Sequence, residues 1–402
     1  MLRTSPGGIV FQAAPESALH PPALEAKVAF LSRPGAYADF HGDILRRETH
    51  MSWVFLVKDR VYKLKKPVRF PYLDFSTLAL RETMCRAEIR LNRRLSPDVY
   101  LGVVPLTVSA AGLSLGGAGA VVDYLVVMRR LDEYAMLDRA LVEHRVRTWQ
   151  VDRLVATLCR FYRRAAPVFI SPRRHLVMWQ RNLNYNRHVL LEPRLGMPAG
   201  LVRRIDRAQR LFLAFRAPLL ADRVRARHIV DGHGDLRPEH ICLGDPPSII
   251  DCLEFNAALR ATDPLDEIAF LCLECERLGN SWAGRYIRQR FQADLPGGVS
   301  DELFAFYRCY RATLRARLAI AHLLEPAPRT PEKWPALARS YLDIARADAI
   351  RLEKLLRMPA DRRAHGRHGD AKRLPQTTAR PAGYRVCPAR SPAPTGTAAP
   401  YR

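Results

Sequence analysis

Two aspartates stand sixteen residues apart in a stretch whose residue types suit phosphate chemistry. It runs from 231 to 254 and reads Asp-Gly-His-Gly-Asp-Leu-Arg-Pro-Glu-His-Ile-Cys-Leu-Gly-Asp-Pro-Pro-Ser-Ile-Ile-Asp-Cys-Leu-Glu. A Gly-Asp-Pro-Pro turn separates two short segments, which predicts a hairpin with Asp235, His240 and Asp251 at one rim. One carboxylate at such a rim can orient a hydroxyl nucleophile, while a second binds Mg²⁺ that bridges nucleotide phosphates.

Loop aspartates more often cap turns than take part in catalysis, and Asp231, Asp235 and Asp251 each have that simpler explanation when taken singly. Their combination favours chemistry instead. The chain has His-Gly-Asp-Leu, then a polar residue five positions after the aspartate, then an aspartate that ends an apolar pair. Such a set is seldom assembled by chance.

The chain resembles the aminoglycoside phosphotransferase family of kinase-like enzymes in its catalytic and metal-binding loops. The resemblance lies in residues 233–236, in His240 and in residues 249–251. Within that family they resemble a bacterial branch of undefined substrate. The resemblance implies Asp235 as the catalytic base and Asp251 as the Mg²⁺ ligand. The family usually has Asn where this chain has His240, and a neutral imidazole is a poorer Mg²⁺ ligand than an amide oxygen. His240 is therefore a candidate metal ligand on which activity depends.

Upstream of this stretch, residues 52–58 and 61–65 predict two strands joined by a two-residue turn at 59–60. Alternate residues of the second strand face the same side, so Lys63 and Lys65 share a face. In a kinase-like fold a strand lysine facing the cleft neutralises nucleotide phosphates. We predict Lys63 in this role, with Lys65 as the alternative. Two exposed lysines that protect a sheet edge are the competing explanation.

No Gly-x-Gly-x-x-Gly loop precedes this hairpin, and residues 48–52 occupy the turn instead. Phosphate contacts would then come from backbone amides and from the hydroxyls of Thr49 and Ser52. The Thr-His-x-Ser run, followed by Tyr-Lys-x-Lys-Lys-Pro, resembles the same bacterial branch.

Apolar spacing predicts an amphipathic helix over residues 76–95, with Ser76 or Thr77 as its N-cap. The resemblance implies that a glutamate on this helix holds the strand lysine. We assign this role to Glu88, with Glu82 as a competitor, and a solvated glutamate is an equally simple explanation.

Two further strands are predicted over residues 103–107 and 121–128, separated by a glycine-rich turn at 110–119. They complete a small sheet. Met128 and Arg130 then mark the hinge between two lobes, where backbone groups would meet an adenine edge.

After residue 132 the pattern changes from strands to helices, which favours an α+β fold with a β-rich N-lobe and a larger helical C-lobe. Asp263 is predicted to cap a helix that starts at Pro264. Asp266 matches a family aspartate that supports the catalytic loop, and Glu254 is a further candidate for the metal region. The helices are expected in five ranges: 151–165, 178–191, 198–217, 303–324 and 334–356.

These elements divide the chain into four regions. We expect a flexible leader over 1–28, a nucleotide-binding N-lobe over 29–130, a helical C-lobe with both acidic loops over 131–358, and a disordered basic tail over 359–402. The tail is rich in Pro, Ala, Arg, Gly and Thr and has almost no apolar periodicity.

The formal net charge is +24, from 64 basic and 40 acidic residues. The nine basic and two acidic residues of the region 359–402 contribute +7 to this total. Non-specific contact with polyanions is therefore expected through the tail. No stripe of interleaved basic and aromatic residues indicates specific nucleic-acid recognition.

No apolar run approaches the roughly 20 residues that span a bilayer, and the N-terminus has no signal-peptide pattern. We therefore expect a cytoplasmic protein without membrane spans. The eight cysteines are scattered singly except Cys272 and Cys275, which share one face of an expected helix. Packing as reduced thiols is favoured over a metal role, because no second pair completes a zinc set.

The sequence thus favours an ATP- and Mg²⁺-dependent phosphotransferase that moves the γ-phosphate to a hydroxyl of a small molecule. A strongly basic protein would not attract a polycationic aminoglycoside, so a neutral or anionic acceptor is expected. Two alternatives stay open: a catalytically weak, nucleotide-binding regulatory module of the same fold, and a basic nucleic-acid-binding protein.

Overall fold

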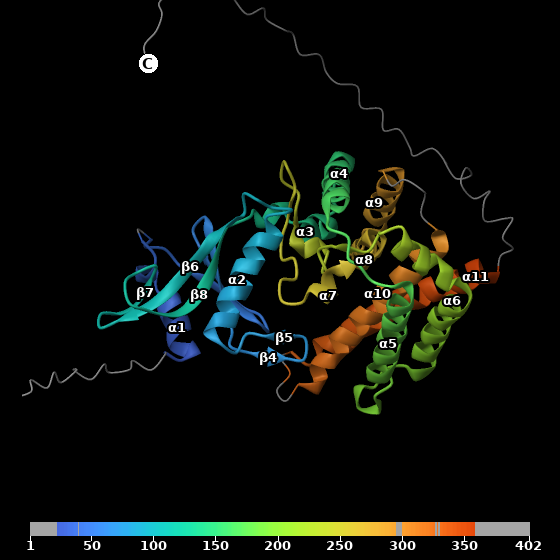
Figure 1. Ribbon diagram of the computed structural model, residues 1–402, viewed down its shortest axis with the longest axis horizontal. Coiled ribbons are helices and arrows are strands. Elements are labelled where there is room, and N and C mark those ends of the chain that lie inside the picture. Colours follow the sequence, from blue (N-terminus) through green and yellow to red (C-terminus); the bar gives the residue numbers. More distant parts are fainter. Residues whose placement is uncertain (1–21, 39, 295–299, 326–327, 329, 358–402) are drawn as a thin grey trace, which may run out of the picture. The chain divides into compact units, whose positions relative to one another are not determined.

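The computed structural model describes residues 22–38, 40–294, 300–325, 328 and 330–357 (Figure 1). The strands of the main sheet all precede residue 130, and most of the helices follow it. The α+β class and the two-lobed order expected from the sequence are therefore confirmed. The predicted tail over 359–402, and the part of the predicted leader before residue 22, lie outside the described residues.

The N-terminal part is built on a six-stranded antiparallel sheet of order β1-β2-β3-β8-β6-β7. Its aliphatic and aromatic residues are typical of strands that bury one face. The strands are β1 (Leu45–Glu48), β2 (Ser52–Val57), β3 (Arg60–Lys65), β6 (Tyr100–Ser109), β7 (Gly112–Leu115) and β8 (Ala120–Arg129). A separate two-stranded hairpin, β4 (Arg69–Phe70) with β5 (Leu73–Asp74), follows β3.

Two details of this sheet differ from the prediction. The turn between β2 and β3 lies at Lys58 and Asp59 rather than at 59–60, and Lys58 takes a positive φ of 51°. The segment predicted as a glycine-rich turn contains strand β7, which pairs with β6. Its glycines at 112, 116 and 119 all have positive φ and make the bends that surround this short strand.

Helix α1 (Leu24–Leu31) packs against the sheet through Val28 and Leu31, which share a core with Phe55 and Leu125. Lys27 donates to the buried carboxylate of Asp123 on β8 at 2.8 Å. The boundary predicted at residue 28 is therefore wrong, because residues 24–28 already belong to the folded N-terminal part.

Helix α2 (Leu78–Asn92) lies across β6 and β8 (Figure 1). It begins where predicted, since the Thr77 side chain accepts a hydrogen bond from the backbone of Leu80 at 3.2 Å. Arg81 donates to Asp123 at 2.8 Å and so ties this helix to the sheet.

The C-terminal part is mainly helical, and the expected helices are present with shifted ends. Helix α6 continues beyond the predicted end at 217. Pro218 causes a kink at Arg216 but does not end the helix. The helices are α3 (Leu137–Val142), α4 (Thr148–Arg164), α5 (Pro172–Leu190), α6 (Ala199–Arg225), α7 (Ala257–Arg260), α8 (Pro264–Arg277), α9 (Ser281–Asp294), α10 (Asp301–Ala321) and α11 (Lys333–Arg357).

Helix α8 is the centre of this part, with every residue from Pro264 to Cys275 buried. Such a helix must be surrounded, and α9, α10 and α11 pack around it. Cys272 and Cys275 are both buried and unpaired in this core, as expected for packing residues. Among the described residues, no helix combines the length and hydrophobicity that a membrane span requires.

Short strands hold the acidic stretch 231–254 on this helical base. Strand β9 (Val230–Asp231) pairs with β12 (Ala261–Thr262), and β10 (Ile241–Cys242) pairs with β11 (Ser248–Ile249). The hairpin predicted across the Gly-Asp-Pro-Pro turn is thus present. It presents both acidic loops toward the sheet.

Candidate active site

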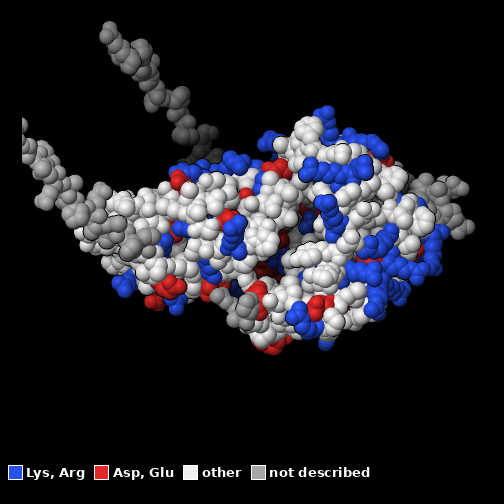
Figure 2. All heavy atoms as spheres, turned by 60° about the horizontal axis from the view of Figure 1, so that its bottom comes forward, with Lys and Arg blue, Asp and Glu red and all other residues white. Residues whose placement is uncertain are grey.

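A cavity of about 540 Å³ separates the sheet from the acidic loops. In Figure 2 the surface is hollowed near the centre of the view, and acidic and basic side chains lie inside the hollow. Every candidate site residue except Glu88 lines the cavity: Ser52, Lys63, Met128, Asp235, His240 and Asp251.

Lys63 is held between two carboxylates that come from different parts of the chain. Its Nζ lies 2.9 Å from Glu88 Oε1 on α2 and 2.8 Å from Asp251 Oδ1. Burial would lower the pKa of this lysine, but the two carboxylates outweigh it and raise the pKa well above its ordinary value. Lys63 is therefore a fixed cation at the wall of the cavity.

Lys65 shares this face of β3, as the strand alternation predicted, but it does not line the cavity. Its Nζ donates to Glu88 Oε2 at 2.6 Å and pairs with Glu254, and the side chain is almost fully buried. The structure also shows which of the two candidate glutamates holds the strand lysines. Glu88 is fully buried between the lysines, whereas Glu82 pairs with Arg86 on the outer side of α2.

Asp235 lies in a tight turn that Gly234 makes possible. Gly234 has φ of 90°, and a Cβ at this position would come within 2.9 Å of the Leu253 side chain. The Asp235 carboxylate accepts a hydrogen bond from Arg237 Nε at 2.9 Å. Burial would raise the pKa of Asp235, but the Arg237 guanidinium outweighs it and holds the pKa below its ordinary value.

His240 has a single tautomer that is compatible with its two partners. Its Nδ1 lies 2.9 Å from the backbone oxygen of Asp235, which can only accept, so Nδ1 carries the proton. Its Nε2 lies 3.2 Å from Arg237 Nη2, which can only donate, so Nε2 is the acceptor. The imidazole is therefore neutral and holds Arg237, and its Nε2 lies 3.6 Å from Asp251 Oδ2.

Asp251 follows β11 in a left-handed conformation, with φ of 62°. The N-terminal part holds its backbone in place, because the Asp251 amide donates to the Tyr100 hydroxyl at 3.0 Å and the Cys252 amide donates to Asn92 Oδ1 at 2.8 Å. The side chain is 48% exposed toward the cavity. Desolvation opposes ionisation, but the charge and hydrogen bond of Lys63 hold the pKa of Asp251 far below its ordinary value.

The catalytic-loop backbone rests on Glu267 rather than on Asp266, which corrects the prediction. Glu267 is fully buried and accepts from the His233 amide at 3.0 Å, from the Gly234 amide and from the Tyr162 hydroxyl at 2.8 Å. Asp266 forms two bonds with Arg311, at 2.7 and 2.6 Å. Successive residues on α8 face different directions, so neighbouring acids reach different partners. The helix cap is confirmed, since Asp263 accepts from the Leu265 amide at 2.9 Å.

Ser52 and Met128 lie at opposite ends of the cavity wall. Ser52 begins β2, and its amide donates to the Thr49 side chain at 2.9 Å, which closes the turn 48–52. Met128 lies near the end of β8, where it pairs with both Val61 and Tyr100. The predicted phosphate turn and hinge thus border one cavity.

Sequence reasoning did not single out Arg237, Glu267 or Tyr100. Arg237 had a detectable signal, because it is a cation two residues after the proposed base. Glu267 directly precedes the apolar run 268–273, where a buried acid must find hydrogen-bond donors. Tyr100 had no signal, since its contact with Asp251 joins residues 151 positions apart.

A strand lysine held by a helix glutamate thus faces two aspartate loops across one cavity. This arrangement agrees with the two-lobed α+β architecture expected from the sequence. No protein-family model matches the sequence of this chain. Uncharacterised proteins of Mycobacterium tuberculosis and Mycobacterium bovis are 32% identical to it over 292 residues, which is 70% of this chain. The match covers 56% of their own length, so the chain spans little more than half of these relatives.

Several solved kinase structures are similar to this chain. A choline/ethanolamine kinase family protein from Mesorhizobium loti has a TM-score of 0.47 at 18% identity, covering 84% of this chain and 96% of that one. A mutant aminoglycoside 2′-phosphotransferase IIIa bound to GDP has a TM-score of 0.47 at 14% identity, with coverages of 81% and 98%. A choline kinase from Cryptosporidium parvum has 0.48 at 8%, with coverages of 83% and 95%. Because these TM-scores lie below 0.5, no function is inferred from them.

Proposed function

We propose that this chain is an ATP- and Mg²⁺-dependent phosphotransferase that moves the γ-phosphate to a hydroxyl of a small molecule. The observation that carries the proposal is the convergence of Lys63, Asp235 and Asp251 on one cavity. A phosphoryl-transfer site needs a fixed cation for phosphate, a hard oxygen ligand for Mg²⁺ and a base for the acceptor hydroxyl. These three side chains supply one of each.

The residues present fit both Mg²⁺ and a nucleotide. Asp251 is ionised and exposes half of its carboxylate to the cavity, which is the donor type that Mg²⁺ prefers. Lys63 already pairs with an anion there, and a nucleotide phosphate would be a second anionic partner. Bound Mg²⁺ would neutralise phosphate charge. The backbone at Met128 and the turn that contains Ser52 would hold the two ends of the nucleotide.

Asp235 would orient the acceptor hydroxyl and accept its proton. Its low pKa keeps it ionised at neutral pH. Arg237, fixed by both Asp235 and His240, would stabilise negative charge on the transferred phosphoryl group. Arg47, Arg129 and Arg130 also line the cavity, but the lining contains as many acidic as basic side chains. The proposal of a neutral or anionic acceptor therefore rests on the net charge of +24 of the whole chain.

We further propose a cytoplasmic location. The cytoplasm would supply the ATP that the proposed reaction needs. It is also a reducing compartment, which suits a chain whose seven described cysteines are all buried and unpaired.

The test combines transfer assays with nucleotide binding. Wild-type protein, ATP, Mg²⁺ and a panel of neutral and anionic alcohols should yield phosphorylated product. Asp235→Asn should lower kcat by about 10²- to 10⁴-fold while retaining nucleotide affinity. Asp251→Asn should abolish Mg²⁺-dependent thermal stabilisation by nucleotide. The control is Asp222→Asn, which removes an exposed α6 carboxylate paired with Arg225. Absence of any Mg²⁺- and nucleotide-dependent stabilisation of the wild type contradicts the proposal.

One observation favours the catalytically weak module as a second candidate: the His240 Nε2 lone pair is directed to Arg237. Its test is His240→Asn. On the phosphotransferase proposal His240 positions Arg237, so kcat should fall while the Mg²⁺ concentration needed for half-maximal rate stays unchanged. A gain in turnover would mean that the natural site is impaired and would favour the regulatory module.

A further inference from the structure

A second group of metal-ligand side chains lies outside the proposed phosphotransfer site. His50 comes from the turn before β2, while His322 and Glu325 follow helix α10. One donor atom of each lies within 4.8 Å of the others. His322 Nδ1 is 2.8 Å from Glu325 Oε1, and His50 Nδ1 is 3.9 Å from the same oxygen. Residues from opposite ends of the chain thus converge on one point.

The surroundings orient the His322 ring. It stacks on His50 with ring centroids 4.7 Å apart and planes within 15°, and it also packs on Trp334 at 4.0 Å. Its hydrogen bond with Glu325 further restricts its rotation. These contacts hold the His322 ring beside both other side chains of the group.

We propose that His50, His322 and Glu325 form a binding site for Zn²⁺ or a chemically similar divalent transition metal. Two imidazoles and one carboxylate form a three-ligand zinc set that leaves a fourth position for water. Mg²⁺ prefers oxygen donors alone, so this donor set selects a different ion from the one proposed at Asp251. Zn–N distances near 2.1 Å require ligand atoms roughly 3.4 Å apart, with the metal in the plane of each ring. The two stacked rings must therefore rotate about their side-chain bonds as well as move inward when the metal binds.

The site would join the two parts of the molecule beside the cavity. His50 lies in the turn 48–52, and its neighbours Thr49, Met51 and Ser52 all line that cavity. His322 and Glu325 belong to the helical part. A bound metal would therefore restrain the turn that we propose for phosphate contacts. This consequence rests on the proposed function, whereas the metal binding itself does not.

The experiment measures metal binding by the full-length chain without nucleotide or Mg²⁺, after chelator treatment. Competition with a chromophoric chelator should show one equivalent of Zn²⁺ bound by the wild type. His50→Gln and His322→Gln should each abolish this equivalent, and Glu325→Gln should weaken it by about tenfold or more because the anionic third ligand is lost. His188→Gln removes an exposed histidine of α5 and serves as the matched control, with unchanged binding.

Co²⁺ provides an independent readout, because a site with two nitrogens, one carboxylate and water should give visible absorption bands that both histidine variants lose. Lack of Zn²⁺ binding by the wild type, or retention of the equivalent in both histidine variants, overturns the proposal. The proposal is also overturned if low pH stabilises the folded protein through these three side chains and added metal does not. Since no nucleotide is present, failure of the phosphotransfer proposal cannot produce any of these results.

Discussion

Lys63 and Lys65 are two residues apart and bind the same glutamate, yet their surroundings give them different roles. The Lys65 side chain is 1% exposed and lies between Glu88 and Glu254, whereas Lys63 is 16% exposed and reaches Asp251. A buried cation between two carboxylates balances their charge. We therefore propose structural support for Lys65 and, on the proposed function, phosphate binding for Lys63.

Substitution by methionine should separate these roles. Lys65→Met leaves two buried carboxylates without their common partner, so the free energy of unfolding should fall by about 3–5 kcal/mol. Lys63→Met should instead raise the nucleotide Kd by about 10- to 100-fold, with a smaller loss of stability. Chemical denaturation and nucleotide titration measure the two effects. An equal loss of nucleotide affinity in folded Lys65→Met protein would make Lys65 the phosphate ligand.

At the scale of elements, helix α8 positions the catalytic loop through a buried acid. Glu267 accepts hydrogen bonds from two successive loop amides, while Asp266 binds Arg311 on α10. The first contact determines the loop conformation, and the second joins two helices of the core. The two neighbouring acids therefore have separable effects.

Glu267→Ala leaves two buried amides without acceptors, at a cost of about 1–3 kcal/mol each, and the loop that carries Asp235 should lose its conformation. We expect a lower melting temperature and a lower kcat. Asp266→Asn should destabilise the fold by weakening the Arg311 pair but leave the kcat of folded protein nearly unchanged. A large kcat effect in Asp266→Asn would restore the original prediction for this residue.

Helix α5 contributes a pH-dependent element to the core. His175 is buried, and its Nε2 accepts from Trp179 Nε1 at 2.9 Å, so the folded state requires the neutral ring. Burial lowers the pKa of His175 below its ordinary 6.5, and the effect exceeds the opposing influence of Asp263 and Asp266. The unfolded chain therefore binds a proton that the folded chain does not.

Stability should consequently fall as pH drops below about 6.5, where the unfolded histidine becomes protonated. His175→Gln removes this titration, so its unfolding free energy should change less steeply with pH between about 6.5 and 5 than that of the wild type. Denaturant melts at several pH values measure the slopes. Identical slopes would show that His175 has the same pKa in both states.

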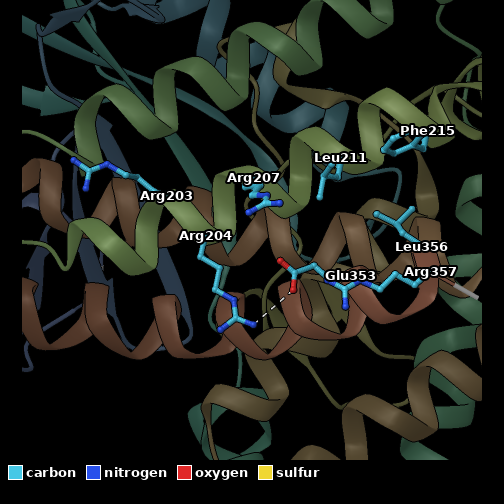
Figure 3. A pocket seen from close by; sticks show the side chains of 8 residues that line it. All are labelled: Arg203, Arg204, Arg207, Leu211, Phe215, Glu353, Leu356 and Arg357. Atoms are coloured by element: carbon cyan, nitrogen blue, oxygen red, sulfur yellow. Dashed lines mark ion pairs between the residues drawn. The ribbon is translucent and has the colours of Figure 1, made fainter.

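At the scale of the whole molecule, the positive charge is not confined to the region 359–402. That region carries +7 of the net +24. Basic side chains also gather over the end of the helical part where α6 and α11 lie (Figure 2). Figure 3 shows three α6 arginines and Arg357 around a cavity of about 560 Å³, with Arg204 directed toward Glu353. The three are Arg203, Arg204 and Arg207.

A chain truncated after residue 358 should therefore keep salt-sensitive binding to heparin, eluting at lower salt than the full chain. Within it, Arg203→Ala with Arg207→Ala should reduce retention more than Arg86→Ala with Arg139→Ala. The second pair removes equal charge, but those arginines are already paired with Glu82 and Glu143. Complete loss of binding on truncation would assign all polyanion contact to the region 359–402.

Much of the architecture was predictable because it depends on near neighbours in the chain. Two apolar-rich runs joined by a short turn predicted β2 and β3, and helical spacing with Thr77 predicted α2. Strand β7 was missed, because its four residues, the first of which is a glycine, carry too short a pattern. The extension of α6 past Pro218 was missed as well, since packing on α5 and α11 compensates for a proline that would otherwise end a helix.

By itself the sequence determined the two acidic loops, because Asp235 and Asp251 belong to one short segment whose turn residues bring them close together. It also placed Lys63 and Lys65 on one face. Only the tertiary structure decided which lysine reaches the cavity, which acid of α8 holds the catalytic loop, and that His50 meets His322. Local patterns specify which side a residue faces, whereas its partner depends on contacts between segments that are far apart in the chain.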